Sequence, residues 1–120
     1  MTQKINLAEK LGAFSEQWSP KIVAELNGQH VKLVKFSGDF VWHSHEHEDE
    51  LFLVIRGRFR MDFRNHSEWI EQGELIVVPR GVEHKPYADA EVEVMLFEPA
   101  STVNTGDAAG DRTVLQPDRI

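Results

Sequence analysis

The feature that most constrains the fold is a series of short apolar segments interrupted by turn-forming residues. None of the segments is long enough to favour a helix, and glycine, proline, asparagine or aspartate separates many of them. The expected strands cover residues 21–26, 29–36, 40–47, 50–56, 58–64, 74–79 and 91–98. About seven short strands with glycine punctuation and almost no helix are typical of a β-sandwich or a β-barrel.

The pattern inside these segments indicates which faces are buried. In segments 58–64 and 91–98, apolar residues alternate with charged ones, which predicts strands that place one face in the core. The residues expected on that face are Phe59, Met61, Phe63, Val92, Val94 and Leu96. Residues 51–55 are apolar throughout, so we expect this strand to be covered on both faces, in a sandwich or under a partner chain.

The two ends of the chain have a different character from this middle part. Asn6 suits the N-cap of a helix, and four apolar residues follow it at helical spacing. These four are Leu7, Leu11, Phe14 and Trp18. We expect residues 1–20 to form a short amphipathic helix or a loosely docked arm, residues 21–98 to form the β-structure, and residues 99–120 to form an irregular tail. A chain of 120 residues is expected to fold as one domain.

Charge and composition limit the expected partners. The chain has 13 basic and 20 acidic residues and a net charge of -7, so its average field repels nucleic-acid phosphates and anionic lipid headgroups. We therefore expect neither a nucleic-acid nor a membrane partner. The N-terminal residues do not resemble a signal peptide, and no apolar run approaches the roughly 20 residues that cross a bilayer, so a cytoplasmic location is expected.

Segment 40–47 contains three histidines in alternation: His43, His45 and His47. On an extended strand their imidazoles project from one face, with neighbours about 7 Å apart along the chain. Cysteine is absent, so a metal ion would be held by nitrogen and oxygen atoms alone, a donor set that suits Fe, Mn, Ni, Cu or Zn. Taken alone, the same histidines could instead decorate an exposed strand edge or a polar turn.

Two longer spacings resemble the two motifs of the cupin superfamily, whose members are small antiparallel β-barrels. The first is His43-Ser44-His45, four residues, Glu50, six residues and Gly57. The second is Gly73, five residues, Pro79-Arg80-Gly81, two residues and His84. The resemblance extends over most of residues 21–98. Gly38 lies one residue closer to the first histidine than the family's leading glycine does, and Ala88 replaces the family's closing asparagine, but neither departure removes a metal ligand.

The resemblance implies an all-β fold, a double-stranded β-helix or jelly-roll-like barrel with a short N-terminal helix or arm. It also implies one divalent transition-metal ion per chain, bound by His43, His45, Glu50 and His84. The turn 46–49 would fold the Glu50 strand back, antiparallel to the histidine strand, so that the carboxylate reaches the same ion. His47 lies among acids typical of a solvated turn and is left as an alternative ligand. His30 and His66 are expected at the surface.

The fold alone does not fix an activity, because cupins include enzymes of several classes, sensors and storage proteins. We expect a metal-dependent enzyme of dioxygenase, isomerase or lyase type that acts on a small organic substrate. The alternative is a non-catalytic module that binds or senses a small molecule. Candidate acid, base or anchoring groups near the pocket are Trp42, Arg80, Lys85 and Tyr87.

Two further expectations concern the subgroup and the assembly. The chain resembles small bacterial cupins termed mannose-6-phosphate isomerase-like, although it contains no glycine-rich phosphate cradle and no clear basic cluster at the expected mouth. A homodimer is expected, because residues 51–55 and the N-terminal segment would both find cover in a second copy of the chain.

Overall fold

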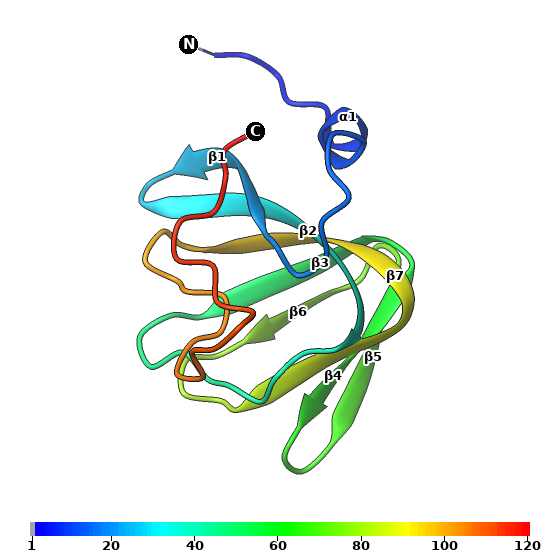
Figure 1. Cartoon of the computed structure of the whole chain (residues 1–120), viewed down its shortest axis with the longest axis vertical. Coiled ribbons are helices and arrows are strands. Elements are labelled where there is room, and N and C mark those ends of the chain that lie inside the picture. The colour runs from blue at the N-terminus through cyan, green and yellow to red at the C-terminus, as the bar shows by residue number, and fades with distance from the viewer. Residues whose placement is uncertain (1) are drawn as a thin grey trace.

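The structure, a computed structural model, describes residues 2–120; Met1, the first residue of the expected N-terminal segment, lies outside the described part. The described residues form one helix and seven strands. They are α1 (Leu7–Leu11), β1 (Lys21–Leu26), β2 (Gln29–Asp39), β3 (Glu50–Arg56), β4 (Arg58–Phe63), β5 (Ser67–Glu71), β6 (Leu75–Val78) and β7 (His84–Pro99). Figure 1 shows the strands wrapped around a common interior, with α1 outside it. The expected fold class, mostly β with a short N-terminal helix, is confirmed.

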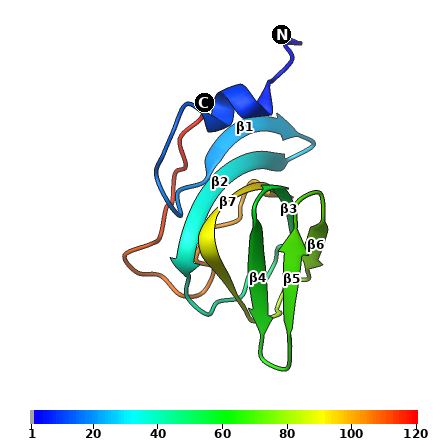
Figure 2. The same cartoon turned by 90° about the vertical axis from the view of Figure 1, so that its right-hand side faces the viewer.

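Strand β7 organises the sheet because it pairs with three other strands. The strand order is β1-β2-β7-β3-β6, and all strand pairs are antiparallel. Residues 84–87 of β7 pair with β4, residues 93–97 pair with β3, and β2 follows the opposite edge of β7. Figure 2 shows how β7 curves and how the β4–β5 hairpin stands beside β3 and β6. The long, bent strand therefore wraps the sheet around an interior.

The interior holds the apolar core. Phe59 and Met61 are fully buried on the expected face of β4, and Val92 and Val94 are fully buried on the expected face of β7. Burial of a side chain of this size contributes about 1.5–3 kcal/mol relative to exposure. The alternation in the sequence therefore predicts both core faces correctly, except that Phe63 at the end of β4 is only half-buried.

The secondary structure of the β-region differs from the expectation most at three places. Strand β7 begins at His84, well before the expected segment 91–98, and runs to Pro99. Residues 40–47 are not a strand, since after β2 the chain leaves the sheet and only His43 forms a bridge in this stretch, to His84. Strand β5 is not predicted by the sequence pattern, because only Ile70 of its five residues is buried. Without apolar alternation a strand gives no periodic signal.

The N-terminal segment contains a shorter helix than the apolar spacing indicates. The Asn6 side-chain oxygen accepts a hydrogen bond from the Glu9 N–H at 3.0 Å, which is the expected cap. The helix ends at Leu11, and Gly12 is its C-cap residue. Trp18 therefore lies outside the helix, and its ring stacks on Phe36 with centroids 4.3 Å apart.

The tail after β7 contains no helix or strand, but it packs against the barrel. Thr105 is fully buried. Ile22 of β1 donates its N–H to the Asp118 carbonyl at 2.8 Å and accepts from the Ile120 N–H at 3.0 Å. The irregular tail is therefore docked at both its middle and its end. In the described part of the chain, no helix has the length and apolar character needed to cross a membrane.

Candidate metal centre

Four buried side chains from three segments meet inside the barrel. His43 and His45 lie in the connection between β2 and β3, Glu50 is the first residue of β3, and His84 is the first residue of β7. One nitrogen or oxygen atom from each lies within 4.8 Å of the others, and all four residues are buried. These are the four residues that the cupin resemblance implies as ligands.

The backbone holds two of the histidines directly against each other. The His43 N–H donates to the His84 carbonyl at 3.1 Å, and the His84 N–H donates to the His43 carbonyl at 2.9 Å. Glu50 reaches the cluster by a different strand pairing from the one expected. Its strand pairs with β6 and β7, not with the histidine segment, because residues 40–47 leave the sheet. The carboxylate therefore meets the histidines across the interior of the barrel.

Hydrogen bonds to backbone carbonyls orient two of the imidazoles. His43 Nδ1 lies 2.8 Å from the Val41 carbonyl oxygen, and His84 Nδ1 lies 2.9 Å from the Val82 carbonyl oxygen. Since a carbonyl can only accept, Nδ1 carries the hydrogen in each neutral ring and Nε2 carries the lone pair. Partners of this kind fix the tautomer and ring orientation of metal-binding histidines.

The donor atoms themselves fit a metal ion. His45 Nε2 lies 2.8 Å and His84 Nε2 lies 3.3 Å from Glu50 Oε1. Despite these short separations, the three atoms are buried without a partner at hydrogen-bond angles within residues 2–120. Buried polar atoms are normally satisfied, and lone pairs that converge in this way suit a cation. Three imidazole nitrogens and one carboxylate oxygen match the preferences of Fe, Mn, Ni, Cu or Zn.

The electrostatics of the cluster favour the protonation states that a metal requires. Burial, followed by the proximity of His84, lowers the pKa of His43 to about 4, so its ring is neutral at pH 7. Burial alone would raise the pKa of Glu50, but the close approach of the His45 and His84 rings outweighs burial and holds the pKa below its usual value. Neutral imidazole and ionised carboxylate are the metal-binding forms.

The tail contacts the segment that carries two of these histidines. The Ser44 N–H donates to Asp107 Oδ1 at 2.8 Å, and the Asp107 N–H donates to the Ser44 carbonyl at 3.1 Å. Gly106 has a φ of 52° and approaches so closely that a Cβ there would overlap the Ser44 carbonyl and lie 3.2 Å from His45 Nδ1. The tail thus holds the histidine segment from outside, a role that its irregular sequence does not predict.

His43 and Glu50 also line a narrow cavity of about 40 Å³. Its other lining residues are Trp18, Pro20, Lys32, Val34, Phe36, Phe40, Phe52, Pro86, Leu96, Glu98, Asn104 and Pro117. Lys32 Nζ and Glu98 Oε2 are 3.3 Å apart, and both side chains are buried. This pair is not among the site residues predicted from the sequence, although alternation places Lys32 on one face with Val34 and Glu98 on one face with Leu96.

The remaining histidines lie outside the cluster. His47, the alternative ligand, has a side chain that is 79% exposed and lies 3.7 Å from a Glu46 carboxylate oxygen. His66 is exposed, as expected. The expected surface position of His30 is wrong, because its side chain is buried and its Nε2 lies 3.0 Å from the Glu25 carboxylate. Trp42, Arg80, Lys85 and Tyr87 are not among the residues that line the cavity.

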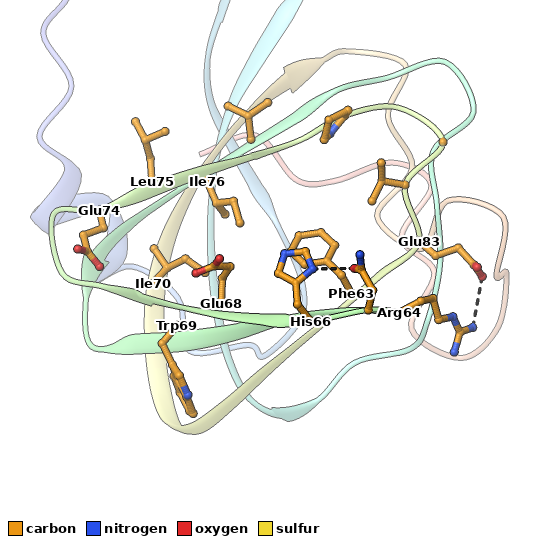
Figure 3. A pocket seen from close by; sticks show the side chains of 15 residues that line it. Phe63, Arg64, His66, Glu68, Trp69, Ile70, Glu74, Leu75, Ile76 and Glu83 are labelled. Atoms are coloured by element: carbon orange, nitrogen blue, oxygen red, sulfur yellow. Dashed lines mark hydrogen bonds and ion pairs between the residues drawn. The ribbon is translucent and has the colours of Figure 1, made fainter.

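A larger hollow of about 910 Å³ lies elsewhere, between β5 and β6. These strands do not pair with each other, and Figure 3 shows the side chains around the gap between them. His66 in this groove hydrogen-bonds with Asn65, and Arg64 pairs with Glu83 at 3.3 Å. The groove is open and brings no cluster of buried donors together among the described residues, so the candidate site is the smaller cavity.

Comparison with known proteins identifies the family. Residues 29–99, more than half of the chain, match the family model Cupin_2, described as a cupin domain. The chain belongs to the cupin family. The match includes β2 to β7 and all four clustered residues of this cupin, and it ends before the tail that contacts Ser44.

Similar proteins support the same conclusion. A cupin-2 domain containing protein from Shewanella frigidimarina NCIMB 400 is 44% identical to this cupin, with a TM-score of 0.78 over 79% of this chain and 93% of that one. Protein NMB1881 from Neisseria meningitidis is 34% identical, with a TM-score of 0.75 over 82% and 100%. The uncharacterized protein YdbB of Bacillus subtilis (strain 168) is 28% identical over 71% of this chain and 76% of its own.

Proposed function

We propose that this cupin binds one divalent transition-metal ion per chain through His43, His45, Glu50 and His84. The observation that carries the proposal is the convergence of buried donor atoms that lie close together without hydrogen bonds. A buried polar atom without a partner costs about 1–3 kcal/mol. A bound cation would remove that cost for several atoms at once. Fe, Mn, Ni, Cu and Zn all suit the donor set.

We further propose that the site belongs to a metal-dependent enzyme acting on a small organic molecule, of dioxygenase, isomerase or lyase type. When bound, the ion would supply Lewis acidity or activate oxygen. Four protein ligands leave positions open in a five- or six-coordinate site, and His43 and Glu50 border a cavity of about 40 Å³ that would admit the reacting atoms of such a molecule. The apolar walls of the cavity, including Phe40 and Phe52, would exclude bulk water from the reaction.

The alternative is a metal-containing module that binds or senses a small molecule without turnover. This alternative is favoured by the positions of the expected acid–base groups. Lys85 pairs with Asp39 at 2.8 Å, and the Tyr87 ring lies 4.6 Å from the Arg60 guanidinium, so both are engaged outside the cavity. Turnover of a metal-bound small molecule separates the enzyme from the module.

Membership of the subgroup of mannose-6-phosphate isomerase-like cupins, which the sequence resembles, is also a proposal. A sugar phosphate would need several cationic or N–H donors around its phosphate group. Among the residues that line the cavity, Lys32 is the one cationic side chain, and Glu98 already pairs with it. We therefore favour a ligand without a phosphate group.

We also propose that the cupin forms a homodimer through the outer face of β3 and β6. Register places Leu51 beside Val77 and Leu53 beside Leu75. Leu51 and Leu53 are half-buried, whereas Leu75 and Val77 are 56% and 50% exposed. Contiguous exposed apolar side chains commonly mark an interface, and a two-fold dimer would cover this patch with its own copy.

Elemental analysis tests the metal proposal. The protein is purified without a histidine tag and analysed beside His45→Ala and His47→Ala. We expect about one equivalent of a transition metal in the parent and in His47→Ala, whose histidine is exposed, and little in His45→Ala. The proposal fails if the parent binds none of the five metals on incubation, or if His45→Ala retains a full equivalent.

A further inference from the structure

Strand β6 has one edge that no other strand of the described chain pairs with. Three strands, β1, β5 and β6, have a single neighbouring strand within residues 2–120. The neighbour of β6 is β3, and the opposite edge of β6 faces the groove of about 910 Å³ between β5 and β6. Figure 3 shows this groove. Free N–H and C=O groups along an edge are a template for pairing with another chain, so an edge needs cover or protection.

The free edges of β1 and β5 have such cover or protection. The tail covers β1, because Ile22 makes one backbone hydrogen bond to Asp118 and one to Ile120. Strand β5 carries two acids, Glu68 and Glu71. Charged side chains on an edge strand oppose its pairing with another chain. Neither β1 nor β5 therefore offers a suitable edge to a partner strand.

Strand β6 has neither cover nor protection. Its sequence is Leu75-Ile76-Val77-Val78, which contains no charged residue, proline or glycine. Leu75 and Val77 point outward and are 56% and 50% exposed. Ile76 is half-buried and Val78 is buried. An uncharged, β-branched edge strand with exposed apolar side chains is the kind that pairs with another chain.

A second copy of β6 is the partner strand that fits this edge. Like charges directly opposite each other on paired strands are destabilising, so most charged strands repel their own copies. Strand β6 carries no charge, and its apolar side chains match those of its copy. A two-fold axis would make the two strands antiparallel, as all the strand pairs of this sheet are. Leu75 and Val77 also belong to the proposed dimer interface.

The exposed side chains select one register for this pairing. A two-fold axis perpendicular to the sheet keeps outward side chains opposite outward ones, so one residue pairs with its own copy. If that residue is Ile76, Leu75 lies opposite Val77 of the second copy, and the two exposed side chains cover each other. If that residue is Val77, Leu75 lies opposite Pro79, which has no N–H to donate to the other strand.

We propose that two copies of this cupin join through the free edge of β6, with Ile76 opposite Ile76 of the second copy. The sheet with the order β1-β2-β7-β3-β6 then continues into the second barrel. This pairing rests on the proposed homodimer and specifies which backbone groups meet in it. The groove between β5 and β6 leaves the edge open to the incoming strand.

Cysteine cross-linking tests the pairing, because the chain has no cysteine of its own. Residues directly opposite each other in an antiparallel pair have Cα atoms about 4.5–5.5 Å apart, within the roughly 4.4–6.8 Å that a disulfide spans. Ile76→Cys is therefore the reporting variant. Its matched neighbour is Val77→Cys, which would lie diagonally from its own copy at about 7–8 Å. Leu53→Cys reports the outer face of β3, where a dimer packed face to face would bring outward side chains together.

The variants are oxidised with glutathione disulfide and compared on a non-reducing gel. We expect Ile76→Cys to become mostly a disulfide-linked dimer, whereas Val77→Cys and Leu53→Cys stay mostly as single chains. The edge pairing is overturned if Ile76→Cys does not cross-link, or if either of the other two variants cross-links as readily.

Amide hydrogen exchange of the parent gives a second readout that needs no variant. It is measured over the concentration range in which light scattering shows the dimer dissociating. We expect the amides of residues 75–78 to exchange about tenfold more slowly in the dimer, the effect of an added backbone hydrogen bond. The amides of β5, residues 67–71, should exchange at the same rate in both states. Unchanged exchange in β6 on dimerisation would contradict the pairing.

Light scattering separates this pairing from the proposals made above. A parent that is monomeric at every concentration removes the homodimer and the edge pairing together. A dimeric parent that cross-links through Leu53→Cys and not through Ile76→Cys keeps the homodimer and removes the edge pairing. The metal content of Ile76→Cys should equal that of the parent, because β6 contributes none of the four clustered residues.

Discussion

His43 and His84 are joined by two backbone hydrogen bonds, although they lie in different segments of the chain. Each residue donates its N–H to the carbonyl of the other, at 3.1 and 2.9 Å, and their ring centroids are 4.2 Å apart. The bridge fixes both backbones, and the carbonyls of Val41 and Val82 fix both rings. The two imidazoles are therefore held in place by the protein itself, which reduces the reorganisation that metal binding requires.

The metal-free protein should lose stability in mild acid. The pKa of His43 is lowered from 6.5 to about 4 in the folded state. Between these values the unfolded chain takes up a proton that the folded chain does not, so the free energy of unfolding falls as pH falls. The loss begins below pH 6.5 and reaches about 3 kcal/mol near pH 4, with no contribution from His43 above pH 7. Urea unfolding of the metal-free protein at several pH values measures it, and His43→Phe should have a flatter profile in this range.

Asp107→Ala should weaken metal binding although Asp107 lies in the tail. Its carboxylate accepts from the Ser44 N–H, and this hydrogen bond lowers the pKa of Asp107. Loss of a partner that positions ligands typically weakens metal affinity about tenfold or more. Competition with a chelator measures the affinity. Asp107→Asn, which keeps an acceptor oxygen, should restore most of it, and Asp111→Ala is the tail control. Equal affinity in Asp107→Ala and the parent would show that the contact has no role in positioning.

Gly106→Ala should destabilise the fold. The added Cβ would overlap the Ser44 carbonyl, and the φ of 52° disfavours a side chain. We expect the free energy of unfolding to fall by about 1–3 kcal/mol, the usual range for overpacking. Gly110→Ala is the matched control, because a Cβ there meets nothing within 4 Å and the stability should be unchanged or slightly higher. Urea unfolding of both variants measures the difference, and similar values for the two would contradict the close approach.

The homodimer should dissociate when the outer face of β6 becomes polar. Leu75→Ser combined with Val77→Ser removes two exposed apolar side chains from the proposed interface. We expect light scattering to report a dimer for the parent and a monomer for this variant, with unchanged metal content. Leu115→Ser removes another exposed leucine, on the tail, and should remain a dimer. A monomeric parent would remove the dimer proposal without affecting the metal proposal.

Much of the fold can be predicted from the sequence because burial leaves a periodic signal. The alternation in β4 and β7 predicts the buried faces of Phe59 and Val94, and Asn6 predicts the start of α1. Strand β5 gives no such signal, because only Ile70 faces the core. Its position follows from pairing with β4, and pairing between strands does not depend on apolar periodicity.

The candidate metal centre is likewise predicted only in part by the sequence. The spacing of His43, His45 and Glu50, together with His84, is visible in the sequence and matches a family motif. The segment 40–47 nevertheless forms no strand, and His47, which shares the alternation, is exposed. Alternation on a strand predicts a shared face only while the backbone stays extended.

The sequence by itself determined the all-β class and the two core faces, because these depend on local pattern, and its resemblance to the cupin motifs implied the four candidate ligands. Only the tertiary structure decided that Lys32 and Glu98 share the cavity and that Asp107 holds Ser44. Such contacts join residues that are far apart along the chain. Their distances depend on strand order and register, which hydrogen bonds and packing set across the whole barrel.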